Sequence, residues 1–167
     1  MPRNLELKAV TSSLVRAATM ARSLPARRAG VLYQTDTYFT VATGRLKLRV
    51  NRGSVAELIA YKRRDHRGAR ISTYSRIPVV NAPEMRKALG GTLGVRSTVR
   101  KRRVVFLYQN ARIHLDSVRG HGSFIEFEVM VRQGMPQARR LMKHLKSVFQ
   151  IRRKDIWPGS YGDRKER

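Results

Sequence analysis

Alternation of apolar and polar residues dominates the sequence. A period of two residues is typical of a β-strand with one face packed in a core. Eight segments carry this period and are predicted to be strands: 3–9, 31–41, 45–50, 55–63, 70–80, 95–108, 111–118 and 123–131. A helical period occurs in three places, which predicts helices over 12–22, 82–89 and 135–148. Glycines punctuate the strands as turns, and we interpret the pair Gly90 and Gly91 in "GGTLG" as a helix stop.

Eight strands with hairpin-length links and few helices predict an α+β protein that is mainly antiparallel β. A sheet of this size can close on itself, and closure removes its exposed edges. We therefore expect a closed eight-stranded barrel, or tunnel, with the helices packed outside. The chain of 167 residues has the length of one domain with a real core.

The charge balance indicates what kind of partner to expect. The 36 Lys and Arg residues outnumber the 11 Asp and Glu residues, which gives a net charge of +25. Such a chain favours an anionic partner: nucleic acid, a phosphate-rich small molecule or an acidic protein surface. The sequence has no cysteine, which excludes disulfides, thiolate zinc sites and cysteine nucleophiles. It has no apolar run of the roughly 18 residues that a membrane span needs, so we expect no membrane partner.

The charged residues of the predicted strands are sorted by sign. In "GRLKLRV", Arg45, Lys47 and Arg49 share one face. In "GSFIEFEVM", Glu126 and Glu128 share one face. An ordinary antiparallel sheet with one solvated face is the alternative for any single strand, but solvated faces usually mix their charges.

Charged faces that point into a closed barrel would line a polar tunnel. Its cations would grip phosphates, and its carboxylates would hold a hard divalent ion that bridges to phosphate oxygens. The first strand, "RNLELKAV", carries both kinds of group, because Glu6 and Lys8 fall on one face together with Asn4. No nucleophilic side chain is needed for such a site.

These strands resemble the CYTH domain, the triphosphate tunnel metalloenzyme superfamily that includes class IV adenylate cyclase and thiamine triphosphatase. The resemblance rests on the order and spacing of several pieces: "NLELKA", "QTDTYFTVATGRLKLR", "ELIAYKR", "VRKRRVVFLY", "ARIHLDSVRGHGSFIEFEV" and "GSYGD". It covers roughly residues 3–163, and we expect one tunnel domain over 1–163 followed by a basic tail at 164–167.

The resemblance implies a tunnel that binds a triphosphate-bearing small molecule with Mg²⁺ or Mn²⁺ and assigns roles by motif position. The implied metal ligands are Glu6, Glu126, Glu128 and Asp116, of which Asp116 is a ligand or a water-positioning group. The implied phosphate-binding residues are Lys8, Arg45, Lys47, Arg49, Lys62, Lys101 and Arg103. Asp116, Lys101 and Arg103 are the implied catalytic residues, and Arg76 and His114 are secondary candidates.

Two departures from the family pattern leave two functions open. Asn4 stands where well-studied members have the first of two glutamates, and an amide supplies an oxygen but no charge. Basic runs such as "RRDHR", "RRLMKHLK" and "IRRKD" also lie outside the charged strands. The first hypothesis is hydrolysis of a phosphoanhydride bond, or cyclisation of ATP. The second is a catalytically weakened tunnel whose basic exterior binds RNA or a ribonucleoprotein.

The sequence favours an intracellular protein, with the cytoplasm as the expected compartment. Residues 13–28 are rich in Arg, Ala and Ser and lack acids, which is also the composition of a mitochondrial transit peptide. This segment follows a predicted strand, and we expect a helix there. The oligomeric state is left open.

Overall fold

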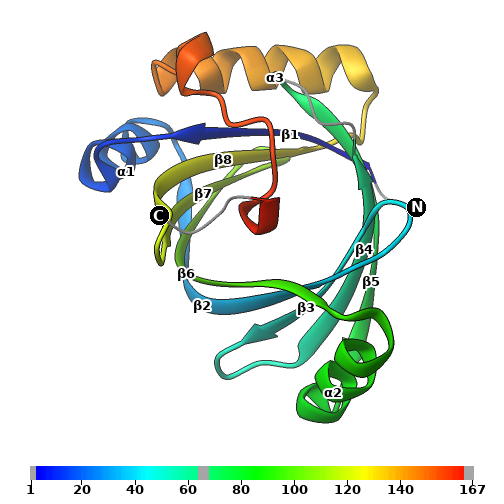
Figure 1. Cartoon of the computed structure of the whole chain (residues 1–167). Coiled ribbons are helices and arrows are strands. Elements are labelled where there is room, and N and C mark those ends of the chain that lie inside the picture. Colours follow the sequence, from blue (N-terminus) through cyan, green and yellow to red (C-terminus); the bar gives the residue numbers. More distant parts are fainter. Residues whose placement is uncertain (1–2, 64–67, 164–167) are drawn as a thin grey trace.

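The computed structural model describes residues 3–63 and 68–163. Eight antiparallel strands close into a barrel in the order β1-β5-β4-β3-β2-β6-β7-β8, with β1 also paired to β8. The strands are β1 (Arg3–Val10), β2 (Arg27–Phe39), β3 (Arg45–Asn51), β4 (Ala56–Arg63), β5 (Arg70–Val79), β6 (Val95–Tyr108), β7 (Ala111–Val118) and β8 (Gly122–Met130). The predicted closed barrel is therefore confirmed (Figure 1).

Three α-helices lie outside the barrel: α1 (Leu14–Ser23), α2 (Ala82–Leu93) and α3 (Met135–Val148). Two short 3₁₀ turns follow, η1 (Arg153–Asp155) and η2 (Tyr161–Asp163). Helix α1 begins where the Ser13 side chain accepts a hydrogen bond from the backbone N–H of Arg16, an N-cap that satisfies one free donor. None of the helices in the described ranges is long and apolar enough to cross a bilayer.

The sequence misplaced the boundaries of two elements by more than two residues. Strand β2 begins at Arg27, not at 31, because Arg27 and Arg28 pair with β6 ahead of a register shift near Gly30. Helix α2 continues through Gly90 and Gly91 to Leu93, so the glycine pair is not the helix stop that we predicted. The stop is Gly94, whose φ of 78° suits glycine and whose N–H bonds to the Gly90 carbonyl. The predicted tail at 164–167 and most of "RRDHR" lie outside the described residues.

The main hydrophobic core lies outside the barrel wall, under α1 and α3. Residues such as Leu7, Ile113 and Phe127 turn outward from β1, β7 and β8 and pack against Leu141 and Leu145 of α3. All five are at least 93% buried. A smaller cluster packs β2 and β3 against α2. Because strand side chains alternate between faces, packing the apolar residues outside directs the polar ones into the barrel.

The η2 turn is inserted at one end of the barrel, where Figure 1 shows it inside the ring of strands. Tyr161 packs there on Phe124, with ring centroids 4.9 Å apart. The Gly162 carbonyl accepts a hydrogen bond from Ser97 Oγ at 3.1 Å. A Cβ at Gly162 would lie 2.7 Å from the Tyr38 ring, so the turn approaches β2 as closely as a glycine allows.

We expect Gly162→Ala to destabilise the protein by about 1–3 kcal/mol, because the added methyl group overpacks the contact with Tyr38. Gly91→Ala is the matched control: its Cβ meets no atom within 4 Å, and alanine favours the α2 helix. Urea unfolding measures both changes. Equal stability of wild type and Gly162→Ala would show that the contact between the η2 turn and Tyr38 is not tightly packed.

Candidate functional site

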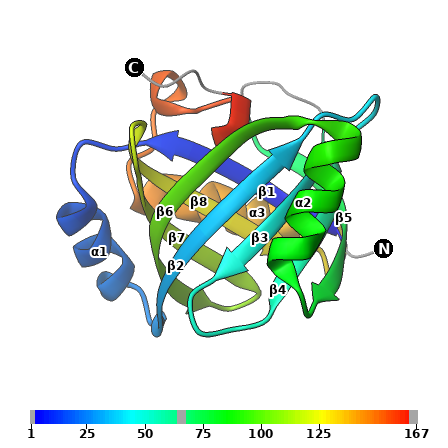
Figure 2. The same ribbon diagram turned by 60° about the horizontal axis from the view of Figure 1, so that its bottom comes forward.

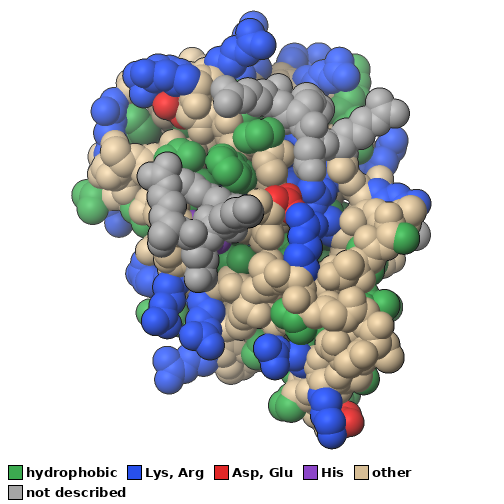
Figure 3. All heavy atoms as spheres, viewed as in Figure 1, with side chains coloured by type: hydrophobic (Ala, Val, Ile, Leu, Met, Phe, Trp, Pro, Cys, Tyr) green, Lys and Arg blue, Asp and Glu red, His purple; other side chains and the backbone are tan. Residues whose placement is uncertain are grey.

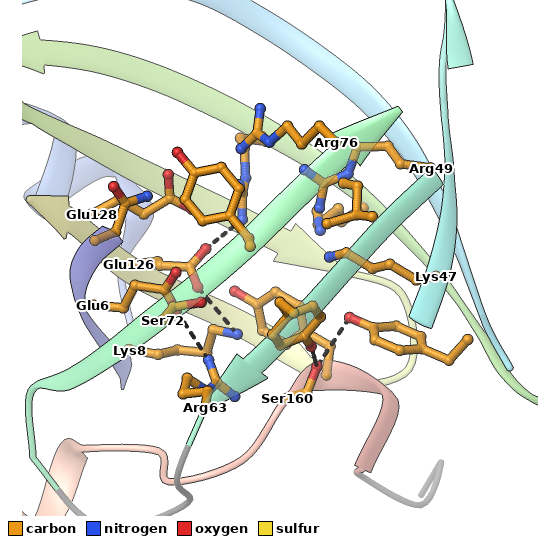
Figure 4. Close-up of a pocket in the computed structure, with 18 residues that line it drawn as sticks. Glu6, Lys8, Lys47, Arg49, Arg63, Ser72, Arg76, Glu126, Glu128 and Ser160 are labelled. Atoms are coloured by element: carbon orange, nitrogen blue, oxygen red, sulfur yellow. Dashed lines mark hydrogen bonds and ion pairs between the residues drawn. The ribbon is translucent and has the colours of Figure 1, made fainter. Parts of the chain in front are cut away.

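The inward faces of seven strands, with the C-terminal segment, line a cavity in the barrel. Figure 4 shows its lining, with cations of β3 on one side and the carboxylates of β1 and β8 on the other. The charged residues that line it are Glu6, Lys8, Lys47, Arg49, Arg63, Arg76, Lys101, Arg103, Glu126 and Glu128. The predicted charged tunnel is therefore present in the barrel.

A carboxylate that the sequence analysis did not single out holds three of these cations together. Asp36, on β2, is fully buried. It accepts hydrogen bonds from Arg49 Nε at 2.7 Å and Nη2 at 2.8 Å. Lys47 Nζ lies 3.0 Å and Lys101 Nζ 2.9 Å from its Oδ2. Although burial alone would raise it, the pKa of Asp36 is held well below its usual range by Arg49, Lys101 and Lys47.

The position of Asp36 was visible in the sequence. Asp36 and Tyr38 share one face of "QTDTYF", and Asp36 pairs with Arg49 in the β2–β3 register. A single acid in a strand next to "GRLKLRV" is the only sequence signal for this cluster. The cations of β3 and β6 therefore converge on one buried charge instead of repelling one another.

A second network fixes Arg103 at the cavity wall. Arg103 donates to Asp116 from Nε at 2.7 Å and from Nη2 at 2.6 Å, and its Nη2 also donates to Glu126 at 2.6 Å. The Tyr161 hydroxyl donates at 2.7 Å to Asp116 Oδ2, the oxygen that also accepts from Arg103 Nη2. Asp116 has no exposed surface and lies behind Arg103, away from the cavity lining.

The carboxylates of the first and last strands face each other across one ladder. Glu6 pairs in register with Glu128, and Lys8 pairs with Glu126. Lys8 Nζ lies 3.3 Å from Glu126 Oε1, and Arg63 Nη1 lies 3.3 Å from Glu6 Oε2. Burial, followed by the charges of Glu128 and Glu126, raises the pKa of Glu6 to about 7. A further cation at this cluster would favour the ionised form of Glu6.

The donor atoms at this cluster fit a divalent cation. One atom each of His114, Glu126 and Glu128 lies within 4.8 Å of the others. Glu128 Oε2 and Asn4 Oδ1 are buried and accept no hydrogen bond from the described part of the chain. Arg112 Nη1 lies 3.6 Å from Glu128 Oε2, which is an ion-pair distance. Mg²⁺ and Mn²⁺ prefer oxygen ligands, so these open oxygens suit them.

The structure brings together most of the residues expected in the tunnel, but neither Lys62 nor Arg45 lines the cavity. Lys62 is exposed on the outer face, and the prediction that it lines the tunnel is wrong. The next residue, Arg63, points inward, because β4 directs Ile59, Tyr61 and Arg63 to the cavity. Arg45 lies near the η2 turn, with its Nη2 2.9 Å from Asp163 Oδ2.

The expected metal-ligand set is only partly assembled. Glu126 and Glu128 lie together, and Glu6 lines the same cavity. Asp116 is separated from them by Arg103, and His114, a secondary candidate, joins the group. Arg76, the other secondary candidate, lines the cavity and lies 3.9 Å from Glu57.

Hydroxyl groups that the sequence analysis assigned no role complete the lining. Ser160 Oγ donates to the Tyr38 hydroxyl at 3.0 Å and lies 3.2 Å from that of Tyr61. Tyr161 carries Lys8 Nζ over its ring, 3.6 Å from the centroid. The motif "GSYGD" was the sequence signal for Ser160 and Tyr161, but only the fold shows that it reaches the tunnel.

We expect Asp36→Asn to destabilise the protein by about 3–5 kcal/mol, because it leaves three buried cations without their counter-charge. Asp155→Asn, which removes an acid that pairs with an exposed arginine, is the control and should change stability by less than about 1 kcal/mol. Urea unfolding at neutral pH measures both. Equal losses in the two variants would contradict a central role for Asp36.

Comparisons with solved structures show where this fold occurs. PH1012 from Pyrococcus horikoshii OT3 superposes with a TM-score of 0.84 at 20% identity, over 96% of this chain and 98% of that one. A putative adenylate cyclase from Vibrio parahaemolyticus gives 0.76 at 17% identity, over 96% and 95%. HpAC1 from Hippeastrum, described as a putative adenylyl cyclase with a dominant triphosphatase activity, gives 0.63 at 13% identity, over 96% and 91%. At these identities the likeness shows the shared fold.

Sequence comparisons identify the family to which the chain belongs. No curated protein sequence matches the chain at a significant level. The family model of the CYTH domain matches residues 2–154. This match covers nearly all of the strands and helices and agrees with the closed barrel and its charged cavity. The chain belongs to the CYTH domain family.

Proposed function

We propose that this protein binds a triphosphate-bearing compound together with Mg²⁺ or Mn²⁺ in its tunnel and hydrolyses a phosphoanhydride bond. The observation that carries the proposal is the arrangement of one cavity, in which the cations of β3 and β6 face the carboxylates of β1 and β8. Cations on one side suit phosphate oxygens, and carboxylates on the other suit a hard metal ion.

The cations would bind and orient the polyphosphate. Arg49 presents a planar fork that matches phosphate oxygens, whereas Lys47 and Lys101 act as point charges. Because all three already contact Asp36, they are held in position before the substrate arrives. Little reorganisation is then needed on binding, which favours catalysis by fixed charges.

Arg103 would stabilise the charge that develops on the transferred phosphoryl group. Its guanidinium is fixed by two hydrogen bonds to Asp116 and one to Glu126. Asp116 acts here through Arg103 and Tyr161, as a positioning residue and not as a ligand. Lys101 stands on the same face of β6, two residues away, and would share this role.

The residues that would hold the metal ion are Glu6, Glu126, Glu128 and His114, with the Asn4 amide oxygen beside them. When bound, a divalent ion neutralises phosphate oxygens and orients a water for in-line attack. Lys8 and Arg63 offset part of the carboxylate charge at 3.3 Å from Glu126 and Glu6. Arg103 at 2.6 Å from Glu126 and Arg112 at 3.6 Å from Glu128 offset more of it, so a divalent ion would compete with four cations for the carboxylate oxygens.

We expect metal-dependent release of phosphate from at least one of inorganic triphosphate, thiamine triphosphate and ATP. Glu126→Gln should lower this rate at least about tenfold, the loss typical of groups around a bound metal. Glu84→Gln, on the exposed side of α2, is the control and should keep the wild-type rate. No metal-dependent turnover of any of the three compounds would refute hydrolysis, and a cyclic nucleotide formed from ATP would instead identify cyclisation.

We expect Asn4→Glu to lower the Mn²⁺ concentration for half-maximal activity by about tenfold, because it adds a charged oxygen to the cluster. Without metal the same change should lower stability, since the added carboxylate meets Glu6, whose pKa is already raised to about 7. Asn4→Ala, which removes the buried oxygen, is the opposing variant and should raise the Mn²⁺ requirement. A metal requirement that is the same in all three proteins would contradict a role for position 4.

A further inference from the structure

The tunnel does not account for the net charge of the protein. The charged groups in and directly behind the cavity wall are nearly balanced: five carboxylates, Glu6, Asp36, Asp116, Glu126 and Glu128, accompany seven cations. The net charge of the chain is +25. Most of the excess positive charge therefore lies elsewhere, and Figure 3 shows Lys and Arg side chains spread over the visible face with few acids among them.

One part of the outer barrel wall combines this charge with an exposed aromatic ring. We define the β2–β6 patch as the outward side chains of Tyr33, Arg52, Arg100, Arg102 and Arg119. Tyr33 is 52% exposed, and all four arginines are exposed. None of the four forms an ion pair with an acid of the described ranges 3–63 and 68–163. These cations are thus available to an outside partner.

The strand register places the members of the patch side by side. Tyr33 pairs with Arg102 across β2 and β6. The Arg52 N–H donates to the Tyr33 carbonyl at 3.0 Å, which brings Arg52 to the other side of the tyrosine. The Arg119 N–H donates to the Arg100 carbonyl at 3.0 Å. Tyr33 is therefore flanked by arginines on both sides, and two more continue the row.

The patch is open and hollowed. In Figure 2, β2 and β6 cross the front of the barrel between α1 and α2. The arginines and Tyr33 line a shallow groove with the hydroxyl-bearing residues Thr35 and Ser117. The alternation that directs the Lys101 and Arg103 side chains to the tunnel directs those of Arg100 and Arg102 to the outer face.

We propose that the β2–β6 patch binds single-stranded RNA. A groove of arginines that grips phosphates, with an aromatic ring on which a base stacks, is the arrangement by which proteins hold single strands. The hydroxyls of Thr35 and Ser117 suit the ribose 2′-hydroxyl, which both donates and accepts a hydrogen bond. An anionic membrane is disfavoured, because the patch lies on strands and offers no apolar helix face to insert.

The test measures binding of a fluorescently labelled 15-nucleotide oligouridine at several salt concentrations. The triple variant Arg100→Gln, Arg102→Gln, Arg119→Gln should reduce the slope of log affinity against log salt by about 2, because each phosphate contact contributes about 0.7 for a single strand. Tyr33→Ala should weaken binding about tenfold, and Tyr33→Phe should retain it.

A matched control removes the same charge from another face. Arg139→Gln, Arg140→Gln, Lys143→Gln lies on the exposed side of α3 and should leave the salt slope within about 1 of wild type. An equal reduction in both triple variants would overturn the proposal, since binding would then follow net charge alone. Binding to oligodeoxythymidine as tight as to oligouridine, or preference for duplex RNA or for phosphatidylserine vesicles, would also overturn it.

Phosphate release from the tunnel separates this proposal from the proposed function. The patch variants change no residue of the cavity, so they should keep the hydrolysis rate of the wild type while losing RNA binding. Loss of hydrolysis in the patch variants would show that the two faces are not independent and would overturn the assignment of this surface to RNA alone.

Discussion

The ion cluster around Asp36 is the constraint on which the rest of the structure depends. Lys47, Arg49 and Lys101 are each at least 91% buried, and cations so far from water are costly without a counter-charge. Asp36 supplies that charge at 2.7–3.0 Å from all three. The barrel can keep these three cations in its interior because this carboxylate binds strands β2, β3 and β6 together from within.

A charged interior determines where the hydrophobic core must be. The apolar faces of β1, β7 and β8 turn outward, so α1 and α3 are required to shield them, and α2 shields β3 in the same way. The part of the wall around Tyr33, Arg100 and Arg102 carries exposed side chains instead of a packed apolar face. The helices thus cover those parts of the barrel wall where the strands present apolar side chains to the outside.

The sequence predicted the barrel because alternation alone defines strands, and it predicted most of the cavity because charge marked the inward face. The sequence did not predict which side chain points inward where two adjacent residues of a strand are both charged. In "AYKR" two cations are adjacent, and only the pairing of β4 with β3 and β5 decides that Arg63 and not Lys62 points inward. Helix α2 continued past two glycines because the third, Gly94, is the one in a left-handed conformation.

Contacts between distant segments were beyond the sequence for a different reason. The resemblance placed Asp116 with the metal ligands, yet its oxygens are occupied by Arg103 and by Tyr161, which is 45 residues away. The only sequence signal for Asp36 was that it is the one acid in its strand. Neither arrangement follows from local periodicity, because each depends on which strands become neighbours when the barrel closes.

The pairing of β1 with β8 has a consequence for how the protein folds. Glu6 and Glu128 belong to the first and last strands, so the carboxylate cluster forms only when the barrel closes over a sequence separation of more than 100 residues. Contacts of such high separation are slow to form and come late. During synthesis the first strand must wait for the last, so Glu6 joins Glu126 and Glu128 only after β8 has been made. Closure of the barrel therefore also completes the carboxylate cluster.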